Sequence, residues 1–221
     1  MKKLIILAIF SLILSISFAQ IPGNIGFNNY YDSQKNLGIK GGINFSNIHG
    51  KDVEDTKSKT GFIVGFFYDI PCTDQFSIQP EILFSMKGWR YEYTDDDWYD
   101  YSYKYWGKLN YIEIPILGKF KLNSINNINP CVYFGPCFGF NVSSTYRYEW
   151  EDYEENDTDT GSMEDVSVFE FSLTPGVMLE FNNQYVFDFR YSIGLTDIFS
   201  DNEGFDPVKY SVISLMLGVK L

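Results

Sequence analysis

The sequence is poor in histidine, cysteine and basic residues. Its 221 residues include one histidine, His49, and three cysteines, Cys72, Cys131 and Cys137. These few residues show no metal-ligand spacing, so neither a metal site nor a cofactor is predicted. The chain has 17 Lys and Arg against 29 Asp and Glu, a formal net charge of −12. That balance argues against a nucleic-acid partner, because phosphate contacts need clustered cations.

Long apolar runs are also scarce. The clearest one, Leu4–Phe18, follows Lys2 and Lys3 and ends just before Ala19. It is shorter than the roughly 20 residues of a membrane-spanning helix. A charged start, a short apolar run and a small residue at its end are typical of a secretory signal peptide. We therefore predict a cleaved signal peptide over residues 1–19, and we expect the protein to be exported.

The remainder of the chain alternates between apolar and polar residues, most clearly in the stretch 184–195, QYVFDFRYSIGL. The odd positions are Tyr185, Phe187, Phe189, Tyr191, Ile193 and Leu195, whereas the even ones include Gln184, Asp188, Arg190 and Ser192. A strict period of two predicts a strand with one apolar and one polar face. Its length reaches the ~9 to 11 residues that a tilted strand needs to cross a bilayer.

Seven further stretches alternate in the same way: 37–46, 61–70, 76–87, 111–122, 131–142, 169–181 and 213–221. The connections at one end are short (71–75, 123–129 and 182–183), and those at the other end are long (47–60, 88–108, 143–168 and 196–209). Short turns and long loops at opposite ends are typical of outer-membrane proteins. We predict an all-β fold, an eight-stranded antiparallel up-and-down transmembrane β-barrel over residues 37–221. Residues 20–36 would form an N-terminal periplasmic segment.

A soluble barrel with an apolar interior has the same periodicity, so the polar positions must decide between the two. Six of them lie near strand middles: Lys40, Glu81, Glu113, Lys119, Asp188 and Arg190. Lipid would not tolerate charges there, whereas a salt-bridged interior would. We predict a structural polar network with Arg190 among Glu81, Glu113, Asp188 and Lys40.

The inward positions as a whole balance in charge. They bring six basic residues (Lys40, Lys87, Lys119, Lys121, Arg190 and Lys220) and six acidic ones (Asp69, Glu81, Glu113, Glu170, Glu180 and Asp188). Eight strands leave an interior that side chains can fill. We therefore expect a plugged barrel that conducts no ions.

Two of the predicted loops have an unusual composition. Segments 89–106 and 146–155 hold all four tryptophans and nine of the 17 tyrosines, together with many carboxylates. The candidate interaction surface for a protein or glycan partner comprises Trp89, Tyr91, Tyr93, Trp98, Tyr99, Tyr101, Tyr103 and Trp150. Alternatively, the aromatics form an interfacial girdle and the acidic tips keep the loops soluble. Divalent cation binding at 95–97 or 151–155 is a third interpretation, although the spacing matches no calcium loop. Alternation inside both segments also suggests strands that continue beyond the membrane.

The remaining chemistry is sparse. His49 lies near Ser46 and Ser58, but no nucleophile motif surrounds it, so no catalytic residue is predicted. Cys131 and Cys137 are too far apart on one strand to pair, whereas Cys72 and Cys131 belong at the same rim and leave a disulfide open. The predicted partner is outer-membrane lipid.

Five blocks carry a family resemblance: LGIKGGINFSN, FSIQPEILFSMKG, LNYIEIPILGKF, PCVYFGPCFGF and FDFRYSIGLTDI. They resemble the PorT-like outer-membrane β-barrel family of the Bacteroidetes group, and the resemblance covers nearly the whole chain after residue 20. It implies location in the outer membrane of a Gram-negative bacterium. It also implies that Pro80, Pro115 and Pro175 are tolerated within strands, while Leu221 departs from the usual aromatic end.

Three functions follow from these observations. The first is a non-enzymatic structural or interaction barrel. The alternative, which the resemblance implies, is an accessory component of outer-membrane protein secretion or envelope assembly, because the family's namesake is linked to secretion. The third is a lipid-modifying barrel enzyme that uses a histidine at the rim.

Overall fold

The computed structural model describes residues 36–221 apart from 52, 54, 96–100, 152–155 and 201–205. The predicted signal peptide and most of the predicted N-terminal segment lie outside the described residues. Twelve strands form one sheet: β1 (Leu37–His49), β2 (Thr56–Tyr68), β3 (Ile70–Pro71), β4 (Phe76–Asp95), β5 (Tyr101–Lys121), β6 (Ile128–Phe134), β7 (Pro136–Glu151), β8 (Asn156–Ser162), β9 (Phe169–Leu173), β10 (Gly176–Phe181), β11 (Tyr185–Gly194) and β12 (Lys209–Lys220). In the described part of the chain, no helix is long and apolar enough to span a membrane.

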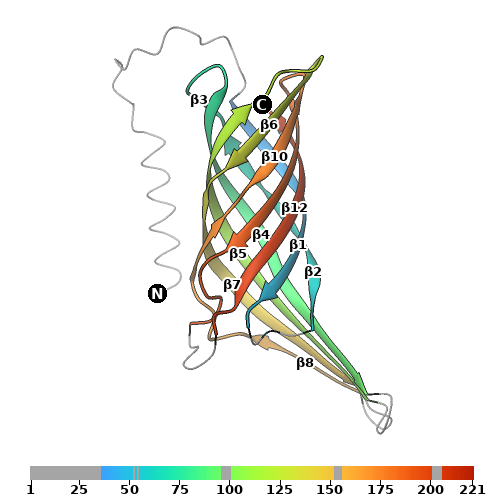
Figure 1. Cartoon of the computed structure of the whole chain (residues 1–221). Helices are drawn as coiled ribbons and strands as arrows, with labels where there is room; N and C mark the ends of the chain where they lie inside the picture. The colour runs from blue at the N-terminus through green and yellow to red at the C-terminus, as the bar shows by residue number, and fades with distance from the viewer. Residues whose placement is uncertain (1–35, 52, 54, 96–100, 152–155, 201–205) are drawn as a thin grey trace. The chain divides into compact units, whose positions relative to one another are not determined.

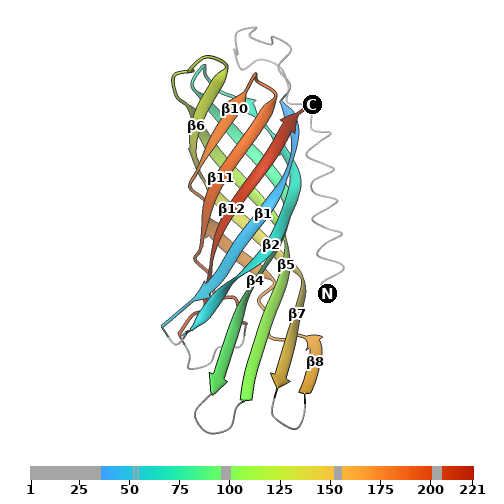
Figure 2. The ribbon, with the colours of Figure 1, turned by 90° about the vertical axis from the view of Figure 1, so that its right-hand side faces the viewer.

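The strand pairings close on themselves. β1 pairs with β2 and β12, and from β12 the pairing runs through β11, β10, β6, β5 and β4 back to β2. All of these pairs are antiparallel, so the predicted all-β antiparallel fold is confirmed. Figures 1 and 2 show the ring from two sides, with its strands tilted around a common axis. A closed ring satisfies the backbone hydrogen bonds of its own edges, as a sheet in lipid must.

Two predicted strands are each divided in two. The stretch 131–142 breaks at Gly135, between β6 and β7, and the stretch 169–181 breaks at 174–175, between β9 and β10. Pro175 has no N–H to donate, and a Cβ on Gly135 would lie 2.0 Å from the carbonyl oxygen of Ile116. The Thr174 N–H donates to the Gly135 carbonyl oxygen at 2.9 Å, so the two interruptions are neighbours.

The predicted continuation of strands into 89–106 and 146–155 is confirmed for the described residues, and the boundaries of the long loops are corrected accordingly. β4 and β5 stay paired as far as Asp95 and Tyr101, and β7 continues to Glu151, where it pairs with β8. Alternating Tyr, Trp and Thr favour strand in these segments. Figures 1 and 2 show β4, β5, β7 and β8 projecting from the end of the ring opposite the C-terminus. At the other end the connections are short, and Asn182 and Asn183 turn with φ values of 52° and 54°.

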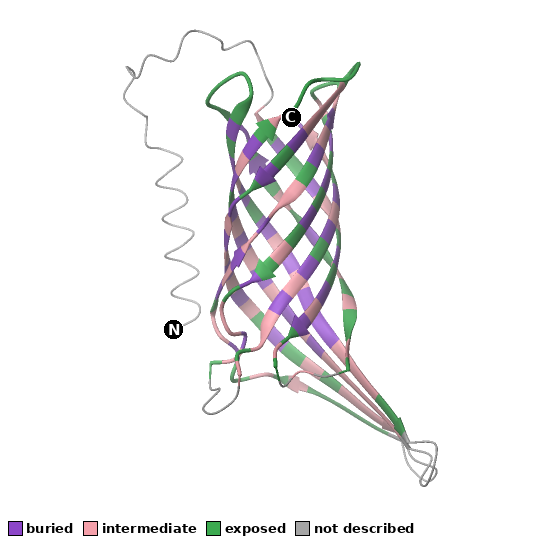
Figure 3. Cartoon of the chain, viewed as in Figure 1, coloured by how far each residue is buried: buried purple, intermediate pink, exposed green. Residues whose placement is uncertain are grey.

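Apolar side chains point to the outside of the ring and charged side chains to its inside, which is the reverse of the arrangement in a soluble protein. On β11, Phe187 and Phe189 point outward and are 36% and 41% exposed, whereas Asp188 and Arg190, which alternate with them, are buried. The same alternation recurs around the ring, as the green and purple bands of Figure 3 show. Large exposed apolar side chains on β1, β2, β4, β5, β11 and β12 form what we call the apolar belt. An apolar exterior around a charged interior matches a lipid environment.

A buried apolar cluster lies inside the ring at the end that carries the long strands. It comprises Ile48, Trp89, Leu109, Tyr111, Val166, Ile198, Tyr210 and Val212. The Trp89 ring packs at 6.0 Å from Phe199 and 6.3 Å from Tyr210, measured between ring centroids. It also covers Gly107, where a Cβ would lie 2.6 Å from the indole. This cluster stands between the interior ion pairs and the projecting strands.

Candidate functional site

Four buried charged side chains of alternating sign, Lys40, Glu81, Arg190 and Asp188, lie together inside the ring. The Lys40 ammonium lies 2.6 Å from Glu81 and 2.7 Å from Asp188. The Arg190 guanidinium pairs with the same two carboxylates, at 3.0 Å from Glu81. The Tyr133 hydroxyl donates to Asp188. Two cations and two anions therefore compensate one another, with hydrogen bonds that a buried ion pair needs.

A second group lies toward the end that holds the C-terminus. Lys119 is 2.7 Å from Asp69 and 2.8 Å from Glu180, and Lys220 is 2.8 Å from Glu180 and 3.4 Å from Asp69. Gln79 links the two groups, because it donates to Glu81 at 2.6 Å and accepts from Lys119 at 3.1 Å. The side-chain network thus runs continuously through these two groups.

The third group is beside the apolar cluster and is not balanced in charge. Lys87 lies 2.7 Å from Glu113 and 2.8 Å from Glu170. Its ammonium also sits 4.7 Å from the centre of the Tyr111 ring. We predicted Glu113 beside Arg190. That prediction is wrong, because Glu113 forms its ion pair with Lys87. Lys87 lies on β4 and Glu113 on the adjacent β5, and their side chains meet across the inner face although the residues are four positions apart in the register.

All six residues of the predicted interior network are buried. The three groups use five cations and six carboxylates, whereas six of each were expected. The difference is Lys121, which is half-buried near the end of β5 and forms no ion pair within the described part of the chain. The interior of the ring is therefore lined by side chains that bind one another.

The projecting strands present two different faces. We call 89–95, 101–108, 145–151 and β8 together the strand extension. One face continues the interior side and carries Tyr91, Tyr103, Tyr105, Tyr148 and Trp150. Tyr103 packs edge-on to Tyr148 at 4.9 Å and to Tyr91 at 5.8 Å. Burial among these rings raises the pKa of Tyr103. Packed aromatic rings give this face rigidity.

The candidate interaction residues divide between these environments. Trp89 is buried inside the ring of strands, so its prediction as a surface residue is wrong. Gly107, which lies opposite it, leaves space for the Trp89 indole. Tyr91, Tyr103 and Trp150 are half-buried on the aromatic face, and Tyr93 is 43% exposed. Trp98 and Tyr99 lie outside the described residues, and of Tyr101 only the strand is described.

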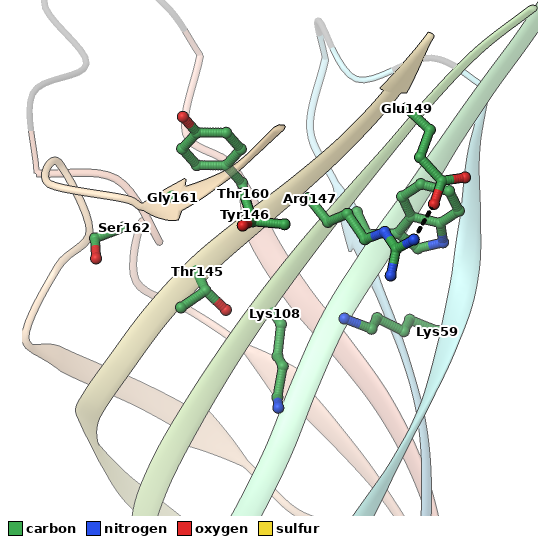
Figure 4. A pocket seen from close by; sticks show the side chains of 10 residues that line it. Lys59, Lys108, Thr145, Tyr146, Arg147, Glu149, Thr160, Gly161 and Ser162 are labelled. Carbon is green, nitrogen blue, oxygen red and sulfur yellow. Dashed lines mark ion pairs between the residues drawn. The ribbon is translucent and has the colours of Figure 1, made fainter. Parts of the chain in front are cut away.

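The other face of the strand extension continues the lipid-facing side and carries charges. Trp106, Lys108, Arg147 and Glu149 lie on it, and Lys59 of β2 reaches toward it. These residues border a hollow of about 770 Å³, which Figure 4 shows with the Lys59, Lys108 and Arg147 side chains around it. Arg147 pairs with Glu149, and its guanidinium is 5.8 Å from the centre of the Trp106 ring. Burial, and to a lesser extent Lys108, lowers the pKa of Lys59 to about 8.

Sequence reasoning missed this hollow. Its three cations are separated widely along the chain, at positions 59, 108 and 147, in a chain that is strongly acidic. Two of them occupy outward positions in the alternation that gives apolar residues nearer the ring. That interruption of the apolar pattern was a signal that could have identified them.

The other sequence candidates are not brought together. His49 is exposed at the end of β1, whereas Ser46 is buried and donates to the carbonyl oxygen of Gly88 at 2.8 Å. All three cysteines are free, with Cys72 exposed and Cys131 and Cys137 buried. The described residues contain no cluster of three or more His, Cys, Asp or Glu that could hold a metal. Most of the acidic tips at 95–97 and 151–155 lie outside them.

The family model described as outer membrane protein beta-barrel domain matches residues 18–200. No match was found among curated proteins. Similar solved structures include Ail, the attachment invasion locus protein of Yersinia pestis, at 15% identity, TM-score 0.37 and coverage of 83% of this chain and 97% of that one. The outer membrane enzyme PagL is 13% identical, with a TM-score of 0.46 and coverage of 83% of this chain and 99% of that one. OprG from Pseudomonas aeruginosa is 12% identical, with a TM-score of 0.40 and coverage of 84% of this chain and 95% of that one.

Proposed function

Since the chain belongs to the outer membrane protein β-barrel domain family, we propose that it is a non-enzymatic barrel with a plugged interior and an exposed interaction surface. Membership of this family indicates the outer membrane of a Gram-negative bacterium. One observation carries the proposal: outward positions are apolar, and inward positions are charged and paired with one another. Such an interior leaves no continuous path for solute, and its buried charges are tolerated because each is paired and hydrogen-bonded.

We count eight strands in the barrel wall. In this grouping β6 and β7 act as one strand across Gly135, β9 and β10 act as one across 174–175, and the short β3 extends β2. β8 pairs with β7 alone and belongs to the strand extension. The closed order of pairings supports this count, because each grouped strand has the same two neighbours along its length.

The strand extension would lie outside the cell. Outer-membrane barrels have short turns in the periplasm and long connections outside, and the connections here divide in that way. Both ends of the ring's chain, near Leu37 and Leu221, would then face the periplasm. The aromatic face of the extension offers rigid rings, one of them Tyr93, at a low entropic cost of binding. It is suited to a protein or glycan partner.

Photo-crosslinking in intact cells tests the interaction role. A photoreactive residue at position 93 should give a crosslinked product with a cell-surface partner, because Tyr93 is exposed on the extension. The matched control is position 89, since Trp89 is enclosed by the apolar cluster. A third probe at 189, in the apolar belt, reports lipid contact alone. Products of equal yield at all three positions, or none at 93, would contradict the proposal.

A second candidate is an accessory role in protein secretion or envelope assembly, which the resemblance to the PorT-like family supports. Deleting the gene separates the two. Loss of secreted cargo with unchanged adhesion would favour the secretion role, whereas altered adhesion or serum sensitivity with normal secretion would favour the surface role.

A further inference from the structure

The lipid-facing side of the wall changes from apolar to cationic within a few residues. On β5 the outward positions run from Ile116 through Ile112 to Lys108. On β7 they run from Phe140 to Thr145 and Arg147. The change coincides with the irregularity in the β5–β7 register between Asn110 and Tyr111. The cations therefore stand immediately beyond the apolar belt, on the side that faces lipid.

A third cation comes from the neighbouring strand. Lys59 lies three residues before the exposed Phe62 of the belt, where the β2–β4 register shifts. Its stem passes over Gly88, where a Cβ would lie 2.8 Å from the Lys59 Cδ, and its ammonium donates to the Gly107 carbonyl oxygen at 3.1 Å. The glycine thus lets the lysine lie across the sheet toward Lys108.

The hollow concentrates positive charge without full compensation. Arg147 is paired with Glu149, but neither Lys59 nor Lys108 has a carboxylate within ion-pair distance among the residues that the structure describes. Other cations on the same face are paired, for example Lys57 with Glu92 at 2.6 Å and Lys104 with Glu151 at 3.9 Å. Mutual repulsion of two lysines in a chain of net charge −12 favours an anion between them.

We propose that this hollow binds the phosphate group of an anionic lipid headgroup. Lys59, Lys108 and Arg147 supply charge-assisted donors to the phosphate. Thr145, Thr160 and Ser162 line the hollow and add hydroxyl donors. Trp106 lies two residues farther from the apolar belt than Lys108 on β5 and packs against Arg147, at the headgroup level where tryptophan is favoured. Headgroup phosphates lie just above the hydrocarbon core, which is the level of these residues relative to the apolar belt.

The lowered pKa of Lys59 fits a site that favours an anion. Burial and Lys108 disfavour the ammonium form of Lys59. A phosphate would favour that form again, because an opposite charge within a few ångströms stabilises it. The lipid therefore binds most tightly where Lys59 is protonated.

The test uses the full-length folded barrel in phosphatidylcholine nanodiscs that contain a small fraction of bisphosphorylated lipid A. The readout is the lipid A retained on the barrel by native mass spectrometry, with dephosphorylated lipid A of the same acyl chains as the comparison. The double variant Lys59→Gln/Lys108→Gln should retain about 10- to 30-fold less phosphorylated lipid A, as expected for loss of two surface cations. The dephosphorylated lipid should bind weakly to every variant.

Lys57→Gln/Lys104→Gln is the matched control, because it removes the same charge from the same face at residues that already have carboxylate partners. It should change retention less than about twofold. Lys59→Arg/Lys108→Arg should retain binding and shows that the sites tolerate substitution.

Equal losses in the two glutamine variants would overturn the proposal, since the effect would then be general charge. Equal retention of the dephosphorylated lipid would also overturn it. So would binding of inorganic phosphate as tight as that of lipid A, because a soluble ion would then be the ligand. None of these outcomes bears on the plugged interior.

Discussion

Asp188→Asn should destabilise the barrel strongly. Asp188 is fully buried and accepts from Lys40 at 2.7 Å, from Arg190 and from the Tyr133 hydroxyl. Asparagine has nearly the same size but no charge, so Lys40 and Arg190 would share Glu81 alone. Breaking one partner out of a buried ion pair costs about 3–5 kcal/mol, because an uncompensated charge stays behind. We expect a loss of that size in the free energy of unfolding.

The measurement is reversible urea unfolding of the barrel in lipid vesicles, followed by tryptophan fluorescence and by electrophoretic mobility. Lys121→Met is the control, because Lys121 is half-buried on the interior side without an ion pair in the described residues. It should stay within about 0.5 kcal/mol of the unsubstituted barrel.

The double variant Lys40→Met/Asp188→Asn distinguishes charge balance from simple loss of contacts. It leaves one cation, Arg190, with one anion, Glu81, and these two groups lie 3.0 Å apart in the unsubstituted barrel. Balance is restored, so the double variant should be more stable than Asp188→Asn alone. Additive destabilisation by the two substitutions would refute the reasoning, as would a loss below about 0.5 kcal/mol in Asp188→Asn.

Three further outcomes are expected. Phe189→Arg should cost roughly 2–4 kcal/mol of folding free energy in lipid, because Phe189 lies in the middle of the apolar belt. Tyr185→Arg, near the end of the belt, should cost about 0–1 kcal/mol. Both costs are measured by urea titration, and equal costs would contradict the assigned position of the belt. Protease added to intact cells should cut the connection between β4 and β5 and spare the one between β5 and β6; the reverse pattern would invert the topology. Lipid A retention should be full below pH 8 and fall as the pH rises above it, because Lys59 loses its proton there; a rise in retention at high pH would contradict the role of Lys59.

The faces of the strands could be predicted from the sequence because period-two alternation is a local property. Phe187 and Phe189 outside, and Asp188 and Arg190 inside, follow directly from it. Which charges meet could not be predicted, because this depends on how far neighbouring strands are displaced along one another. Glu113 was expected beside Arg190, but its side chain meets Lys87 at 2.7 Å, although the β4–β5 register sets Glu113 opposite Leu83 and Lys87 opposite Leu109.

The continuation of strands beyond the membrane could be predicted from the alternation of Tyr in 89–106 and 146–155, but the exact strand ends could not. Long connections were read from interruptions of the apolar pattern, yet hydrogen bonding continues through them, so that Trp89 turns into the ring and β8 forms an additional strand. The basic hollow depends on three strands meeting beyond the apolar belt. The convergence of three separate strands cannot be predicted from a local sequence pattern.

The central claim, a plugged interior, is tested most directly by single-channel recording of the purified barrel in planar bilayers at neutral pH, with a known porin as the positive control. Five cations and six carboxylates bound to one another inside the ring predict negligible conductance over long recordings. Steady, reproducible ion conduction by the unsubstituted barrel would contradict the account, because these charges would then line a transport path.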